Sequence, residues 1–258
     1  MNKQQLLNIY TKELRMEPVE AGWKRESTEF VTRHISLHND KGFILYSNLT
    51  EENADKMIEE EMEYFKSLSQ SFEWKLYDYD QPVNLKERLV AKGFTVEDSE
   101  ALLVLDLNSA ATVVEHKIPA EIKPIITEQG IDAIVKLEDE IWGTPHAKLG
   151  EQLKRNLTKD PDHLYLYGAY ADGKLVSAAW MYLHENTSFG SLWGGSTLPE
   201  YRNKGFYTSL LAVRAGQAMK KGYTLLTVDA SPMSSPILQK RGFQFLAYTN
   251  PCLSPKFE

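Results

Sequence analysis

The segment 197–211 constrains the fold of this 258-residue chain more than any other stretch. Gly205 allows close backbone approach in a tight turn, and the apolar residues from Phe206 onward recur at helical spacing. The pattern predicts the end of a strand, a turn and the start of a long helix. A helix N-terminus presents unpaired N–H groups and a positive dipole end, here with Arg202 and Lys204 nearby. The segment is therefore a candidate site for a phosphate or pyrophosphate.

Composition narrows the class of protein. The chain is 42% hydrophobic and 25% charged, as soluble globular proteins are. No window approaches 18 uninterrupted apolar residues, and the residues after Met1 do not open a signal peptide, so we expect a cytoplasmic protein with no membrane partner. The single cysteine, Cys252, excludes an intrachain disulfide and a cysteine-based metal cluster. We expect no metal.

Charge is unevenly distributed along the chain. Residues 1–120 carry 14 basic and 22 acidic side chains, whereas the remainder carries 15 and 14. The acidic half is a poor candidate for a polyanionic ligand, and the C-terminal half does not repel one. Because no basic stripe is present, we expect no nucleic-acid partner.

The order of predicted elements favours an α/β fold with two domains. In the N-terminal half, residues 1 to about 25 are predicted to form a helix, and strands and helices then alternate from about residue 29 to residue 107. A polar stretch that begins at Asn108 then leads to Pro124 and reads as a linker, which predicts domains at 1–118 and 119–258. The second domain is predicted to contain a strand at 122–126, helices at 130–141 and 147–157, three strands within 163–197, a helix at 203–221, a strand at 224–230, a helix at 233–240 and a strand at 243–248.

An internal repeat supports the division into two domains. Residues 77–94 and residues 228–243 both read as the end of a strand, Asp and Pro at a turn, a short helix and Gly-Phe before the next strand. The N-terminal copy has no matching phosphate turn, because acidic residues follow Asn48 where a phosphate would have to bind. We therefore expect one anion site, in the second domain.

Two motifs resemble a known family. Arg202-x-x-Gly205-x-Tyr207 is similar to the Arg/Gln-x-x-Gly-x-Gly/Ala loop of GNAT-superfamily N-acetyltransferases, and the segment 231–243 is similar to the Gly-Phe ending of that family. The resemblance covers about 125 residues. It implies a tandem GNAT protein with a degenerate N-terminal domain, each domain a mixed, mostly antiparallel sheet flanked by helices.

The resemblance also implies a site for acetyl-CoA. Its pyrophosphate would bind backbone N–H groups beside Arg202, and its pantetheine arm would pair with the strand near Gly195. Gly194-Gly195 suggests a β-bulge, and the Gly195 N–H would stabilise the oxyanion. The expected cofactor-binding residues are Ser196, Thr197, Arg202, Asn203, Lys204, Gly205, Phe206, Tyr207, Thr208 and Ser231.

Two residues depart from the family pattern. Tyr207 replaces a small residue in the loop, and Leu238, which cannot donate a proton, stands where many members carry a tyrosine. A general base is left open. Asp229 is the expected catalytic candidate because it ends the strand beside the cofactor cleft. The alternatives are Glu185, His184, Glu140 and His146, with Glu140 and its neighbours Glu138 and Asp139 read as a solvated helix face and His184 and Glu185 as an exposed hairpin tip. Trp142, Trp180, Trp193 and Tyr201 could line an acceptor pocket.

The leading hypothesis is an N-acyltransferase. A small-molecule or peptide amine would attack acetyl-CoA directly in a ternary complex, without a covalent enzyme intermediate. The rival hypothesis, motivated by Leu238 and Tyr207, is a catalytically silent acyl-CoA-binding module for sensing or assembly. The sequence leaves the acceptor and the oligomeric state open.

Overall fold

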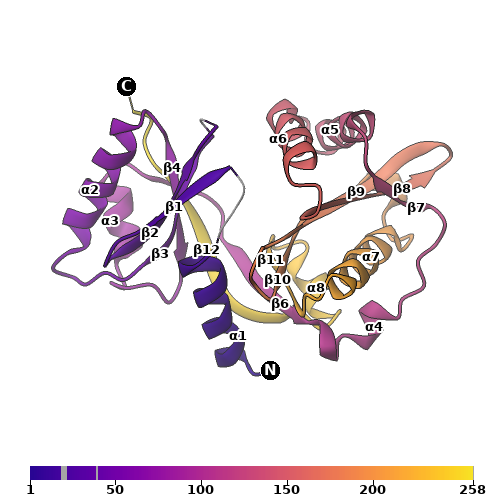
Figure 1. The fold of residues 1–258 in the computed structure, drawn as a ribbon, viewed down its shortest axis with the longest axis horizontal. Helices are drawn as coiled ribbons and strands as arrows, with labels where there is room; N and C mark the ends of the chain where they lie inside the picture. The colour runs from indigo at the N-terminus through magenta and orange to yellow at the C-terminus, as the bar shows by residue number, and fades with distance from the viewer. Residues whose placement is uncertain (19–21, 39, 258) are drawn as a thin grey trace. The chain divides into compact units, whose positions relative to one another are not determined.

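A computed structural model confirms the mixed α/β class that the sequence predicts (Figure 1). The chain forms two compact units, and each is described by itself. The described residues are 1–18, 22–38 and 40–257.

The two units divide the chain differently from the expected domains 1–118 and 119–258. Unit 1 comprises Met1–Val104 and Asp229–Glu258, and unit 2 comprises Leu105–Val228. The last thirty residues belong to unit 1 because strand β12 (Gln244–Leu253) pairs antiparallel with β4 (Phe72–Tyr77), with Thr249 opposite Tyr77.

Unit 2 is built on a sheet with the strand order β7-β8-β9-β10-β11. Neighbouring strands are antiparallel except β10 and β11, which are parallel. Asp172 and Gly173 join β8 to β9, and both have positive φ, as a tight Asp-Gly hairpin turn requires. The strands are β7 (Ile122–Ile125), β8 (Leu164–Ala171), β9 (Lys174–Leu183), β10 (Phe189–Thr197) and β11 (Leu225–Ala230).

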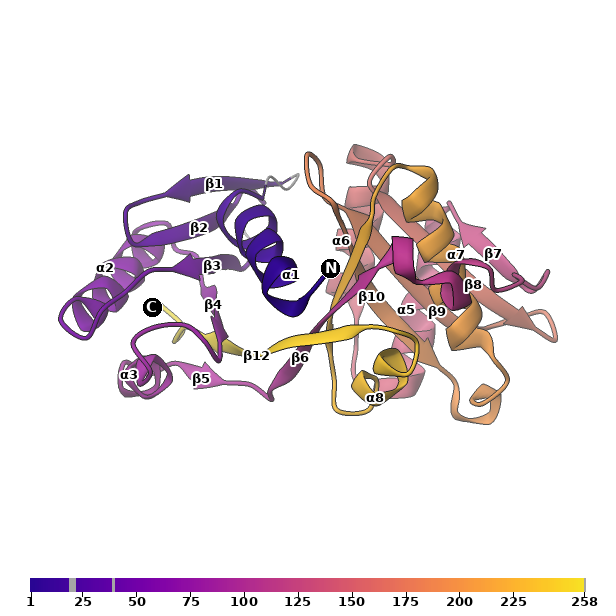
Figure 2. The same ribbon diagram turned by 90° about the horizontal axis from the view of Figure 1, so that it is seen from below.

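Helices cover both faces of the unit 2 sheet. Helices α5 and α6 lie on one side of β8, β9 and β10, and α7 lies on the other, as Figure 1 and the view from below in Figure 2 show. Thr127 caps α5 by accepting a hydrogen bond from the Gly130 N–H, and Gly143 ends the helix with φ of 69°. The helices are α4 (Ala111–Val114), α5 (Glu128–Trp142), α6 (Ala147–Lys159) and α7 (Phe206–Lys220), with 3-10 turns η2 (Leu107–Ser109) and η3 (Pro199–Tyr201).

The core of unit 2 lies between these helices and the sheet. Ile131, Ile134 and Leu137 present the apolar face of α5, and they pack in one cluster with residues of β8 and β9. Burial of these side chains fixes α5 against the sheet, so polar residues on the same helix face are held in place beside β10.

Unit 1 has the strand order β1-β2-β3-β4-β12-β6. All pairs are antiparallel except β3 and β4, and β5 pairs with β12. Helices α2 and α3 lie on one side of these strands and α1 on the other (Figure 1). The elements are α1 (Lys3–Tyr10), the π-helix η1 (Thr11–Met16), β1 (Trp23–Ser27), β2 (Val31–Ser36), β3 (Gly42–Ser47), α2 (Ala54–Ser67), α3 (Leu85–Ala91), β5 (Thr95–Val96), β6 (Glu100–Asp106) and α8 (Ser235–Gln239), with β4 and β12 as given above.

The same topology occurs in both units. In unit 2 the hairpin β9–β10 continues through α7 to β11, which is parallel to β10. In unit 1 the hairpin β2–β3 continues through α2 to β4, which is parallel to β3. This correspondence agrees with the repeat seen in the sequence, and a tandem origin stays a prediction.

Candidate active site

A β-bulge in β10 is the centre of the candidate site. The register between β10 and β9 shifts between Gly194 and Ser196, which confirms the bulge predicted from the glycine pair. Gly194 and Gly195 have φ of 69° and 88°, a region that other residues rarely adopt. A Cβ on Gly194 would lie 2.4 Å from the Trp180 ring, so both the conformation and the packing require glycine.

Beyond the bulge, β10 no longer pairs with β11. The parallel ladder between them covers Phe189–Ser191, whereas β10 continues to Thr197. An unpaired strand edge offers backbone N–H and C=O groups to an extended ligand. Ser196 and Thr197, which the sequence predicts to bind the pantetheine arm, lie on this part of β10.

Arg214 supports the bulge from α7. Its Nη1 donates to the carbonyl oxygens of Trp180 and Trp193 at 3.0 and 3.2 Å, and its Nε donates to the Leu210 carbonyl. The side chain is buried, and desolvation lowers the pKa of the guanidinium to about 10. The guanidinium thus donates hydrogen bonds to two backbone carbonyl oxygens on the strands β9 and β10 beside the bulge.

The turn after β10 leads to the N-terminus of α7. Asn203 and Gly205 both have positive φ, and Gly205 is the N-cap residue. Glycine has no side chain to act as a cap, and among the described residues no side-chain cap hydrogen bond is made at this N-terminus. The Arg202 Nε donates to the Thr197 carbonyl at 3.1 Å, which ties the turn to the end of β10. The helix begins at Phe206, three residues later than predicted, because the turn itself is not helical.

Tyr207 points toward the bulge. A Cβ on Gly195 would lie 2.9 Å from Tyr207 Cε2, so the phenol ring packs directly against Gly195. Burial raises the pKa of the hydroxyl, and the charge of Arg214 acts in the opposite direction. The residue that departs from the family loop therefore contacts the strand, instead of pointing away along α7 or into the turn.

Glu138 lies on the other side of the bulge. Its Oε2 accepts hydrogen bonds from Ser196 Oγ at 2.8 Å and from Trp142 Nε1 at 2.9 Å. The residue is only 4% exposed, and Oε1 is buried without a hydrogen-bond partner. Burial raises the pKa of this carboxyl, while the hydrogen bonds from Ser196 and Trp142 lower it.

The expectation that residues 138–140 form a solvated face is wrong for Glu138. The helical spacing contains the signal, because Glu138 follows Ile131 by seven residues and Ile134 by four, and both are buried. Glu140 is exposed, as expected, with its Oε1 3.7 Å from Lys174 Nζ.

His184 is partly buried, whereas the sequence indicated an exposed hairpin tip. Its Nε2 lies 2.8 Å from Ser191 Oγ, which also accepts a hydrogen bond from Trp193 Nε1 at 2.9 Å. Burial, with a smaller effect of His163, lowers the pKa of His184 to about 4. A neutral imidazole is therefore part of a hydrogen-bonded chain with Ser191 and Trp193. Glu185, its neighbour, is exposed.

The other candidate residues have separate partners. His146 precedes α6, and its backbone N–H and Nδ1 both contact Asp139 Oδ1. Of the four aromatic candidates for an acceptor pocket, Trp142 and Trp193 are 62% and 52% exposed, Trp180 is buried and Tyr201 is half-buried.

Three candidates belong to unit 1. Asp229 forms an ion pair with Lys75 and accepts a hydrogen bond from Thr249 Oγ1. Ser231 lies in the turn before α8, where its Oγ accepts from the Ser234 N–H. Leu238 is buried, as expected of a residue that packs and does not titrate.

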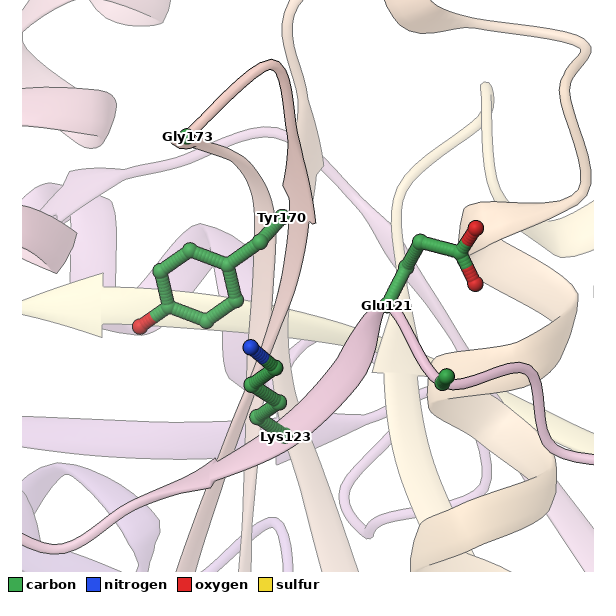
Figure 3. A pocket seen from close by; sticks show the side chains of 5 residues that line it. Glu121, Lys123, Tyr170 and Gly173 are labelled. Carbon is green, nitrogen blue, oxygen red and sulfur yellow. The ribbon is translucent and has the colours of Figure 1, made fainter.

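A surface pocket of about 440 Å³ lies elsewhere on unit 2. Its lining comes from β7 and the β8–β9 hairpin, and Lys123 Nζ lies 5.7 Å from the Tyr170 ring centroid (Figure 3). Since β8 and β9 separate β7 from β10 in the sheet, this pocket is not the space beside the bulge. It is lined by Ala120, Glu121, Lys123, Tyr170 and Gly173.

Comparison with known proteins agrees with this geometry. Residues 131–243 match the model of the acetyltransferase (GNAT) family. The chain contains a GNAT acetyltransferase domain. The family supports acyl transfer as the class of activity. The match includes the bulge, the turn, α7 and the Gly242-Phe243 ending on which the resemblance was first seen.

Solved structures extend the likeness in fold to the whole chain. A GCN5-related N-acetyltransferase from Kribbella flavida is 14% identical, with a TM-score of 0.66, and the alignment covers 98% of this chain and 94% of that one. A conserved protein of unknown function from Staphylococcus epidermidis ATCC 12228 is 12% identical, with a TM-score of 0.69 and coverage of 97% and 99%. A tandem GNAT protein from the clavulanic acid biosynthesis pathway is 11% identical, with a TM-score of 0.56 and coverage of 92% and 85%. No curated protein sequence matches significantly.

Two features are absent from the described residues. None of their helices has the length and apolarity that crossing a membrane requires. No three His, Cys, Asp or Glu side chains among them gather in a way that could hold a metal ion.

Proposed function

We propose that this GNAT protein transfers the acetyl group of acetyl-CoA to a primary amine, by direct attack in a ternary complex. One observation carries the proposal: a glycine bulge on β10 and an uncapped N-terminus of α7 lie at the two ends of the segment 194–206. The Arg202–Thr197 hydrogen bond links the end of β10 to the turn that precedes α7. The first feature suits a thioester and the second suits a pyrophosphate.

The pyrophosphate would bind at the N-terminus of α7. Backbone N–H groups and the helix dipole favour an anion there, and Arg202 and Lys204 add positive charge. The pantetheine arm would then extend along the free edge of β10 at Ser196 and Thr197. In this proposal the N–H donors are those of Asn203, Lys204, Gly205, Phe206, Tyr207 and Thr208.

The thioester carbonyl would lie at the bulge. A backbone N–H at Gly195 would stabilise the oxyanion that forms when the amine attacks, a contribution of about 3 kcal/mol per donor. No metal and no covalent enzyme intermediate take part. Asp229 is a poorer candidate for the general base than the sequence indicated, because its carboxylate is paired with Lys75.

Two residues favour a second function, a silent acyl-CoA-binding module. Leu238 offers no proton to the departing thiolate, and Tyr207 packs against the glycine that would carry the oxyanion donor. A coenzyme A thiolate can take its proton from water, so Leu238 does not prevent transfer. We therefore keep the transferase as the first proposal.

Release of free coenzyme A thiol separates the two functions. The protein is incubated with acetyl-CoA and a panel of aminoglycosides, polyamines, amino acids and peptides, and the thiol is measured over time. We expect amine-dependent release with at least one class. Acetyl-CoA binding by calorimetry with no release from any amine would favour the silent module.

A further inference from the structure

Glu138 is the feature of unit 2 that the proposed cosubstrate does not explain. Its carboxylate reaches from α5 to Ser196, the residue that follows Gly195 in the bulge, with Oγ and Oε2 2.8 Å apart. It therefore lies one residue from the N–H that would face the thioester carbonyl.

The unpartnered oxygen of Glu138 is energetically costly. The residue is 4% exposed, and Oε1 has no hydrogen-bond partner although Oε2 has two. Leaving a buried polar atom unpaired costs about 1–3 kcal/mol, and more for a charged group. A carboxylate whose role was only to hold Ser196 and Trp142 would not need this second oxygen unpaired. A bound hydrogen-bond donor would relieve the cost.

Two exposed indoles belong to the segments that hold this carboxylate. Trp142 donates its Nε1 hydrogen to Oε2 and ends α5, and Trp193 lies on β10 two residues before Gly195. They are 62% and 52% exposed, which is unusual for side chains of this size. Indole faces attract cations, and a buried carboxylate attracts an ammonium more strongly than an exposed one does.

We infer that Glu138 is the ammonium-binding group and general base of the acceptor site, and that the acceptor is a cationic primary amine with an apolar flank. The inference rests on the proposed function. The indoles of Trp142 and Trp193 would contact the apolar flank, and Oε1 would receive the ammonium. This assigns to α5 the catalytic role that the sequence had assigned to Asp229.

Access requires Trp142 to move. The Trp142 indole Nε1 already donates a hydrogen bond to Glu138 Oε2, and the Glu138 carboxylate is buried. The side chain is largely exposed and is the last residue of α5, so rotating it disturbs little packing. An incoming ammonium, with three N–H donors, replaces the single indole donor and reaches both oxygens.

The proton and electron balance follows from this placement. The ammonium gives one proton to Glu138, and the freed nitrogen lone pair forms the C–N bond while the carbonyl π electrons move to oxygen. The tetrahedral intermediate re-forms C=O and breaks the C–S bond. The second nitrogen proton goes to the departing thiolate, and Glu138 returns its proton to solvent. The products are the amide, coenzyme A thiol and one proton.

Ligand binding tests the inference without requiring turnover. Tryptophan fluorescence of the full chain with acetyl-CoA present is titrated with 2-phenylethylammonium and with spermidine, and with the neutral 2-phenylethanol as control. We expect the ammonium compounds to change the fluorescence at concentrations about tenfold lower than the alcohol does. The change should disappear in Trp142→Phe. In Glu138→Gln the preference for ammonium should be lost, while the affinity for acetyl-CoA stays within about twofold.

Turnover provides the second measurement. For an amine that the wild type acetylates, Glu138→Gln should lower kcat/KM by about 100-fold or more, as loss of a general base does. Glu140→Gln, on the exposed face of the same helix, is the matched control and should retain wild-type activity. Ser196→Ala removes one hydrogen bond to Glu138 but keeps the base, so its kcat/KM should fall much less than that of Glu138→Gln.

The outcomes are distinguishable. No preference for ammonium in the wild type, or the same preference in Glu138→Gln, overturns the inference even if acetyl-CoA binds. Equal kcat/KM for Glu138→Gln and Glu140→Gln also overturns it and leaves the proposed transferase intact. Failure of the wild type to bind acetyl-CoA overturns the proposed function itself.

Discussion

Two constraints require glycine at position 195, its positive φ and its contact with the Tyr207 ring, and the sequence shows only the first. A glycine pair within an apolar strand predicts a bulge, and the positive φ at both glycines confirms it. The contact between Gly195 and Tyr207 could not be predicted, because it depends on how α7 crosses the strand that precedes it. Tyr207, which departs from the family loop pattern, is thereby explained by its contact with Gly195.

Gly195→Ala should destabilise the protein by about 1–3 kcal/mol, since alanine is strained at this φ and its Cβ meets the Tyr207 ring. Urea denaturation followed by circular dichroism measures the loss. Gly216→Ala is the matched control, because Gly216 lies within α7 with no atom near its missing Cβ, and should be neutral or slightly stabilising. In the Tyr207→Ala background the cost of Gly195→Ala should fall but not vanish. An unchanged cost would show that the ring contact is unimportant.

His184 predicts a pH dependence of stability. Its folded pKa is about 4, below the usual value for histidine, so the unfolded chain takes up a proton below about pH 6.5 while the folded chain does not. Its contribution to stability is therefore complete above pH 6.5 and falls as the pH falls toward 4, by about 3 kcal/mol in total.

The comparison with His184→Gln isolates this effect. Glutamine keeps a hydrogen-bonding group near Ser191 Oγ but does not titrate. Between pH 7 and pH 4 the free energy of unfolding should fall more steeply for the wild type than for the variant. Parallel curves would mean that His184 titrates normally in the folded protein.

At the scale of single elements, periodicity predicted most of unit 2. The helix at α5, the hairpin β8–β9 and the strand-turn-helix at α7 all lie within a few residues of the predicted bounds. Their signals are local, since they consist of apolar spacing, caps and turn residues. The error at Glu138 arose because three consecutive acidic residues were read together, whereas helical spacing places only the first beneath α5.

The N-terminal elements were predicted less well. A helix was expected over about residues 1–25, but α1 ends at Tyr10, η1 follows it and β1 begins at Trp23. Strand β1 is short and mostly exposed, and it is stabilised by pairing with β2, so its own residues carry little alternation. The end of β12 was also missed. The strand was predicted to end at residue 248, but it extends to Leu253 because it pairs with β4.

The single thiol of Cys252 tests the docking of β12. Cys252 is fully buried between Trp74 and Val96, and burial raises its pKa to about 12. Labelling by a disulfide reagent should therefore be at least about 1,000-fold slower in the native protein than in urea-unfolded protein, an opening free energy of about 4 kcal/mol. The unfolded chain is the control because it contains the same thiol. Rapid labelling in native buffer would mean that β12 detaches readily from unit 1.

At the scale of the whole molecule, the order of elements was predictable and their grouping was not. Composition placed a boundary near residue 118, but residues 229–258 belong to unit 1 because Thr249 pairs with Tyr77 and Glu100. Pairings between residues more than 140 positions apart leave no local signal in the sequence. The repeat was visible because residues 77–94 and 228–243 both carry Asp and Pro at a turn, a short helix and Gly-Phe.

The acidic N-terminal half agrees with a single cofactor site. The helix of unit 1 that corresponds to α7 is α2, which follows Glu51 and Glu52, whereas α7 follows Arg202 and Lys204. Like charges repel a pyrophosphate at the first helix and opposite charges attract it at the second. The central claim is therefore that acetyl-CoA binds at the N-terminus of α7.

Calorimetry with acetyl-CoA on Gly205→Asp and Gly222→Asp tests this claim most directly. Both glycines have φ near 90° and open space around the missing Cβ, so the two variants carry similar backbone strain at opposite ends of α7. A carboxylate at Gly205 would meet the pyrophosphate, and we expect affinity to fall by about 100-fold there and to change little at Gly222. Equal affinities for the wild type and both variants, or no binding by the wild type, would contradict the account.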